Sequence, residues 1–315
     1  MDTTVGRTDD GGARTFEVTG SRPRAPFGPD PVPEGIDVVE VDSPAGPLTA
    51  FLAASGVPER GRVLMVPGYT GSKEDFTHFI PRLTAHGYAV LAYSQRGQAD
   101  SAAPRGRSHY RLDDFVGDLL VMASHMGAGP GHPVHLLGHS FGGVVARAAV
   151  IADPRPFATL TLFSSGPRAV MGAVSPLLLA LVPHGRIGHR ILMRALHPDM
   201  PDAPQADPRL ETLRLRSRVS ADDNLVGAGR ILTTYGDMTR ALAATGIPVH
   251  LVHGDADPVW PLDWYPEEAR ILGARHTVIP HAQHSAQWEN PGALAPALVD
   301  FWDAHRPSPD RPTPH

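Results

Sequence analysis

The sequence predicts an α/β protein whose mainly parallel sheet carries helices on both faces. Short apolar runs without polar alternation recur along the chain, as expected of strands that are buried on both faces. Segments with helical periodicity separate these runs, and this alternation favours parallel strands joined by helical crossovers. One run leads straight into Gly-His-Ser-Phe-Gly at residues 138–142 and then into a helical segment, which predicts a sharp turn at one edge of the sheet.

The composition is that of an ordinary folded protein of 315 residues, with 42% hydrophobic and 19% charged side chains. The formal net charge of −5 offers no basic surface, so we expect no nucleic-acid partner. The absence of cysteine excludes disulfides, thiolate nucleophiles and cysteine-bound metals, and we expect neither a metal nor a cofactor. The sequence has neither a signal-peptide pattern nor an apolar stretch long enough to span a bilayer, which predicts a cytoplasmic protein.

Eight strands and five helices are expected between two proline-rich tails, residues 1–34 and 305–315, which we predict to be flexible. The first two strands flank Ser-Pro-Ala-Gly and predict a hairpin. The predicted strands are Ile36–Val41, Leu48–Ala53, Val63–Val66, Ala89–Tyr93, Val134–Leu137, Thr159–Phe163, Val249–Val252 and His276–Ile279. The predicted helices are Glu74–His86, Leu112–Met126, Phe141–Ile151, Leu262–Leu272 and Ala293–Ala304.

The interval 167–246 is too long for an ordinary crossover and predicts a helical cap inserted into a core of residues 35–166 and 247–304. Its helical stretches are expected at 188–196, 208–219 and 226–244. Between residues 186 and 218 it holds seven arginines against four acidic residues. Two interpretations stay open for this surplus: attraction of an acidic, carrier-linked or coenzyme A-linked substrate, or a solvated, salt-bridged helix face.

The turn at 138–142 makes Ser140 the candidate nucleophile. Gly138 and Gly142 permit a sharp strand-to-helix turn that exposes the hydroxyl, and the N-terminus of the following helix favours developing negative charge. A serine hydroxyl needs a base, usually a histidine that a carboxylate orients. His284 follows the last predicted strand and Asp257 follows the strand before it, so both lie at strand ends as Ser140 does.

Neighbouring residues compete for these roles. Asp255 could replace Asp257 as the acid, and His281 could replace His284 as the base. His139 stands beside the nucleophile, but its side chain is expected to point away from Ser140 because side chains alternate along a strand.

These motifs together resemble the α/β-hydrolase superfamily over roughly residues 36–304. Val-Leu-Met-Val-Pro-Gly-Tyr at 63–69 resembles the loop after the third strand of that family, and Tyr-Ser-Gln-Arg-Gly-Gln-Ala-Asp-Ser at 93–101 resembles its Asp-x-Arg-Gly-x-Gly-x-Ser segment. The resemblance implies Asp257 as the acid in Gly-x-x-Asp-x-x-x-Pro and His284 as the final histidine before Glu-Asn-Pro. It also implies that the backbone N–H groups of Tyr69 and Phe141 form the oxyanion hole.

Four positions depart from the family pattern without removing a catalytic group: Pro67, Ser94, Ala99 and Gln283. Ser140 itself argues against the epoxide hydrolases and haloalkane dehalogenases of the superfamily, which use aspartate at this position.

The resemblance implies a cofactor-independent serine hydrolase that cleaves an ester, thioester or lactone, an activity of the carboxylic ester hydrolase class. The alternatives are an acyltransferase or cyclase with the same triad, or a ligand-binding protein with incidental turnover. The partner is then a small acyl compound, and the oligomeric state stays open. Thr70, Tyr235 and Trp260 are candidates for lining its pocket.

Overall fold

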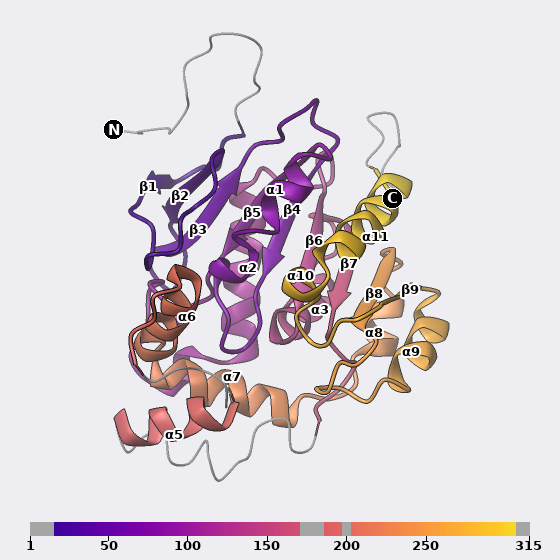
Figure 1. Ribbon diagram of the computed structural model, residues 1–315. Helices are drawn as coiled ribbons and strands as arrows, with labels where there is room; N and C mark the ends of the chain where they lie inside the picture. Colours follow the sequence, from indigo (N-terminus) through magenta and orange to yellow (C-terminus); the bar gives the residue numbers. More distant parts are fainter. Residues whose placement is uncertain (1–15, 171–185, 197–202, 307–315) are drawn as a thin grey trace.

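The computed structural model describes residues 16–170, 186–196 and 203–306. Its centre is a nine-stranded sheet in the order β1-β2-β3-β5-β4-β6-β7-β8-β9 (Figure 1). The strands are β1 Ser21–Pro23, β2 Ile36–Val41, β3 Leu48–Ala53, β4 Gly61–Val66, β5 Tyr88–Tyr93, β6 Val134–His139, β7 Phe157–Phe163, β8 Val249–Gly254 and β9 Arg275–Ile279. β1, β2 and β3 are antiparallel, and all pairings from β5 to β9 are parallel, which confirms the predicted α/β architecture.

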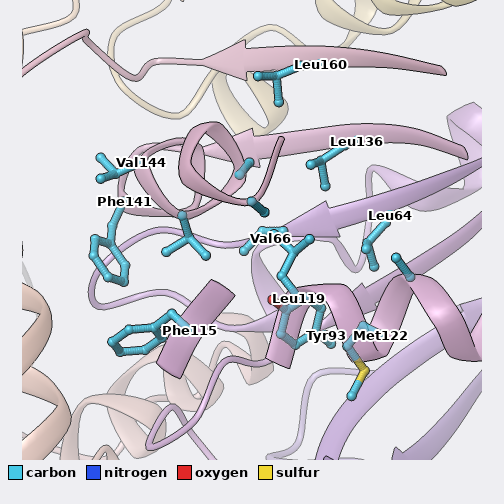
Figure 2. Close-up of a cluster of buried hydrophobic side chains, with 14 of the residues drawn as sticks. Leu64, Val66, Tyr93, Phe115, Leu119, Met122, Leu136, Phe141, Val144 and Leu160 are labelled. Carbon is cyan, nitrogen blue, oxygen red and sulfur yellow. The ribbon is translucent and has the colours of Figure 1, made fainter. Parts of the chain in front are cut away.

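Helices cover both faces of the sheet. Leu64 and Val66 of β4 belong to the cluster that packs against α2, Leu112–His125, and α3, Phe141–Ala152 (Figure 2). The alternate residues Val63 and Met65 belong to the opposite cluster, which α1, Ile80–Thr84, and α11, Pro291–Ala304, cover. This explains why the central strands carry apolar residues on both faces and only a few polar ones, such as Arg62 of β4 and His135 of β6.

The structure differs from the predicted secondary structure at two places before β5. β1 is a ninth strand, and it lies with the buried Phe16 and Val18 inside the segment expected to be a tail. The expected helix at 74–86 is two elements, the 3-10 turn η1, Lys73–Phe76, and α1. Pro81 in the first turn of α1 explains the break, because proline lacks the N–H that a continuous helix would need there.

Four helices lie between β7 and β8 along the described chain. They are α5 Arg186–Leu196, α6 Pro208–Val219, α7 Asp222–Thr234 and α8 Thr239–Ala243, so the helix expected at 226–244 is also divided. Figure 1 shows α5 and α7 along the lower edge of the sheet, whereas α8 packs against α3 and α9, Trp264–Leu272. Three short elements complete the fold: η1 above, η2 Arg107–His109 and α10 Ala286–Glu289.

Candidate active site

Ser140 occupies a strained turn between β6 and α3. Its φ of 54° and ψ of −119° lie in a region that residues with a side chain rarely adopt. A Cβ at Gly138 would lie 2.4 Å from the carbonyl oxygen of Gly142, and a Cβ at Gly142 would lie 2.3 Å from that of Val66. Both glycines are therefore required for the backbone to close around the serine.

His284 and Asp257 form a hydrogen-bonded pair. His284 Nδ1 lies 3.0 and 3.1 Å from the two carboxyl oxygens of Asp257, which also accept the N–H of Val259 at 2.9 Å. Burial alone would raise the pKa of Asp257, but the hydrogen bond and the charge of His284 hold it below its ordinary value. A carboxylate bonded to Nδ1 leaves Nε2 as the basic nitrogen of the ring.

Asp255 and His281, the competing candidates for the acid and the base, make other contacts. The carboxylate of Asp255 accepts the backbone N–H of His281 at 2.9 Å and that of Ala282 at 3.2 Å. His281 itself is exposed and has a φ of 55°. Asp255 and His281 thus shape the loop that leads to His284, and the geometry favours Asp257 as its partner.

His139 has a role that the sequence did not reveal. Its Nε2 donates to the backbone oxygen of His284 at 2.8 Å, and its ring packs against Phe163. Burial lowers the pKa of His139 to about 4, so the ring is neutral at pH 7. It lines the pocket together with Ser140, contrary to the expected alternation, because the strained backbone at Ser140 ends the strand geometry. His139 therefore holds the loop of the base.

A cavity of about 220 Å³ lies over Ser140. It is lined by the sequence-predicted Ser140, His284, Tyr69, Thr70 and Trp260, and by His139, which the sequence singled out only as the neighbour of the nucleophile. The other lining residues were not singled out by the sequence: Gly68, Gly71, Asp75, Arg216, Leu232, Val259 and Ser285. Tyr235 is not part of this lining. Its hydroxyl donates to the carbonyl of Gly166 at 3.0 Å, and Gly166 in turn contacts the Trp260 ring closely.

The loop that carries Tyr69 is fixed on both sides. The Tyr69 hydroxyl donates to the carbonyl of Leu225 on α7 at 2.5 Å. The side-chain amides of Gln95 and Gln98 donate to the carbonyls of Pro67 and Gly68 at 2.9 and 2.6 Å. These bonds engage the carbonyls of the loop and so hold its backbone in place.

The two expected oxyanion donors are available for a ligand. Among the described residues, the backbone N–H groups of Tyr69 and Phe141 donate to no carbonyl or side chain. Phe141 is the first residue of α3, where the helix leaves its N–H groups unpaired. The hydrogen bonds of the described residues also include none between Ser140 Oγ and His284, a contact that unliganded sites often form only with substrate.

The departures from the family pattern have structural counterparts. Ser94 Oγ accepts the backbone N–H of Lys73 at 3.0 Å and so fixes η1 beside the pocket loop. Ala99 has a φ of 44°, in the left-handed region that the usual glycine adopts without strain.

In the described ranges, no helix is long and apolar enough to cross a membrane, and no group of three histidine or acidic residues could hold a metal.

The sheet, its helices and the strand–serine–helix turn are those of an α/β hydrolase. More narrowly, residues 57–289 match the model of the Hydrolase_4 family, described as serine aminopeptidase S33, and the chain belongs to this family.

Two curated relatives match over part of their length. Epoxide hydrolase B of Mycobacterium tuberculosis is 33% identical over 84 residues, which are 27% of this chain and 23% of that protein. The AB hydrolase superfamily protein YfhM of Bacillus subtilis is 25% identical over 166 residues, which are 53% of this chain and 56% of that protein. The chain thus covers less than two thirds of either relative.

Solved structures share the fold over most of the chain. A thermophilic esterase from Thermogutta terrifontis superposes with a TM-score of 0.70 at 20% identity, covering 85% of this chain and 99% of that one. The enol-lactonase from Burkholderia xenovorans LB400 gives 0.68 at 18% identity, covering 83% and 98%. At such identities the likeness concerns the fold.

Proposed function

We propose that this protein is a serine hydrolase that cleaves an ester, a thioester or a lactone through Ser140, His284 and Asp257. The observation that carries the proposal is one pocket that contains a strained serine and a histidine bonded to a buried aspartate. The esterase and lactonase among the structural neighbours are consistent with it. We further propose that α5 to α8 act as a cap over this pocket.

In the proposed reaction His284 Nε2 takes the hydroxyl proton of Ser140 as Oγ forms a bond to the acyl carbon. The electron pair of the carbonyl moves to its oxygen, which the N–H groups of Tyr69 and Phe141 stabilise. When the tetrahedral intermediate collapses, the bond to the leaving group breaks and His284 returns the proton to it. Water repeats the sequence on the acyl-enzyme, with His284 as its base, and restores Ser140. Asp257 stabilises the cationic form of His284 throughout.

Labelling with a fluorophosphonate probe tests the proposal. Intact and peptide mass spectrometry is expected to find one adduct, on Ser140, that forms on the folded protein and not on the denatured one. The adduct should be absent from Ser140→Ala and form at least ~10³-fold more slowly in His284→Ala, because the hydroxyl loses its base. Ser140→Ala that keeps the hydrolysis rate of the wild type, on esters, thioesters or lactones, would contradict the proposal.

The products of the same assays separate hydrolysis from acyl transfer. Addition of an alcohol or amine acceptor is expected to leave the free acid as the main product. If the ester or amide of the acceptor predominates instead, the protein is an acyltransferase with the same triad.

A further inference from the structure

Arg216 places a permanent positive charge in the wall of the catalytic pocket. It lies near the end of α6, outside the sheet, yet it lines the same cavity as Ser140 and His284. Its side chain is only 7% exposed, so its charge acts where little water screens it. Buried arginines are rare unless the guanidinium has partners, which makes its contacts informative.

Among the described residues, one nitrogen of this guanidinium donates hydrogen bonds. Nη1 donates to Ser72 Oγ at 3.2 Å and to Asp75 Oδ1. Within the described ranges, Nε and Nη2 donate to no residue, and neither is one of the buried polar atoms that lack a partner. Arginine carries five N–H groups, so the free edge keeps three donors that remain accessible.

Asp75, the counter-ion, has a hydrogen-bond donor on each of its two oxygens. Its Oδ2 accepts the backbone N–H of Ser72 at 3.3 Å and lies against Gly71, where an added Cβ would meet it at 2.3 Å. Its Oδ1 is occupied by Arg216. The pair therefore offers a ligand unused donors and few unused acceptors.

The lining of the cavity also includes three apolar side chains, Leu232, Val259 and Trp260. A neutral acyl chain would bury these surfaces but leave the free edge of Arg216 without a partner, and an unpaired buried donor is costly. A carboxylate would satisfy two of its N–H groups at once, in the planar geometry that guanidinium groups favour.

We propose that the substrate carries a carboxylate besides its scissile acyl bond, and that the free edge of Arg216 binds it. The proposal rests on the proposed function, because it names the substrate class of the same pocket. Arg216 is thus a specificity-determining residue, which the sequence showed only as one member of the arginine surplus between 186 and 218.

The test compares two series of 4-nitrophenyl esters: monoesters of dicarboxylic acids from adipate to suberate, and the unsubstituted acyl chains of the same length. Ser140→Ala supplies the uncatalysed rate for each ester. The readout is the ratio of kcat/KM for the anionic ester to kcat/KM for its neutral counterpart. We expect the wild type to favour an anionic ester and Arg216→Gln to lower the ratio about 10- to 100-fold, as expected for loss of a charged hydrogen bond.

Two further variants keep the test decisive. Arg216→Lys retains the charge without the planar fork, and its ratio is expected to fall between those of the wild type and Arg216→Gln. Arg214→Gln is the matched control, since Arg214 lies on the same helix, is similarly buried and pairs with Glu211 outside the pocket lining. Its ratio is expected to equal that of the wild type.

The outcomes distinguish this inference from the proposed function. If Ser140 reacts with the fluorophosphonate but the ratio is the same in wild type and Arg216→Gln, the carboxylate proposal is overturned and the hydrolase proposal stands. A preference for a cationic ester would also overturn it, since Asp75 would then be the recognition group. If Ser140 does not react at all, the proposed function itself fails.

Discussion

Asp257 and Asp255 are two residues apart, yet their carboxylates have different partners. The carboxylate of Asp257 is hydrogen-bonded to the ring of His284. The carboxylate of Asp255 instead accepts backbone N–H groups of the loop that precedes His284. We expect Asp257→Asn to lower kcat by about 10²–10⁴, because the asparagine amide can present an N–H to Nδ1 and favour the wrong tautomer of His284. Steady-state hydrolysis of a reactive ester and the rate of fluorophosphonate labelling measure the effect.

Asp255→Asn is the control for this change. It keeps an oxygen that can accept a loop N–H and leaves the Asp257–His284 pair untouched, so we expect kcat within about threefold of the wild type. Equal losses in the two variants would contradict the assignment of Asp257 as the acid.

At the scale of elements, η1 is anchored by the only lysine of the chain. Lys73 Nζ lies 2.6 Å from Glu74, 2.8 Å from Asp100 and 3.1 Å from Thr49 of β3, and its side chain is fully buried. Burial alone would raise the pKa of Asp100, but Lys73 lowers it below its ordinary value. The cluster ties the loop after β4, which carries Tyr69, to the antiparallel side of the sheet.

We expect Lys73→Met to reduce the free energy of unfolding by about 3–5 kcal/mol, because the buried Glu74 would lose its cation and Asp100 would keep only Arg24, 3.2 Å away. Urea denaturation at pH 7 measures this loss. The matched control is Arg155→Ala, which removes an exposed ion pair with Asp153 and is expected to change stability by less than about 0.5 kcal/mol. A Lys73→Met protein as stable as the control would show that the cluster is not an anchor.

At the scale of the whole molecule, buried histidines make stability depend on pH. Burial lowers the pKa of His135 and His250 to about 3 and that of His139 to about 4. In the unfolded chain each histidine binds a proton near pH 6.5, whereas the folded protein keeps these three neutral. The unfolded state therefore binds more protons below pH 6.5, and stability is lost as the pH falls toward 4.

Each of these histidines contributes a slope of about 1.4 kcal/mol per pH unit in that window. Urea denaturation at pH 7, 6 and 5 is expected to give a steep decline of the free energy of unfolding, and His135→Gln a shallower one. Stability that stays constant from pH 7 to pH 5 would contradict this account.

The sequence was most informative for features that depend on residues close together in the chain. The turn at Ser140 needs two glycines, because a Cβ atom at either position would collide with the backbone. Both glycines lie within two residues of Ser140, so the requirement can be recognised in the sequence. The parallel strands were predictable because burial on both faces leaves few polar positions in them, so that no alternation of apolar and polar residues remains. β1 escaped prediction because it has three residues, two of them exposed, and takes its order from pairing with β2.

The sequence by itself therefore determined the α/β class, the strained serine and the order of the candidate acid and base along the chain. Only the tertiary structure decided that Asp255 binds the backbone of the loop before His284, that His139 supports this loop, and that Arg216 reaches the catalytic pocket. The physical reason is distance along the chain: Arg216 and Asp75 are 141 residues apart and meet only because α6 packs beside the loop after β4. Such contacts depend on how whole elements pack, which no local pattern encodes.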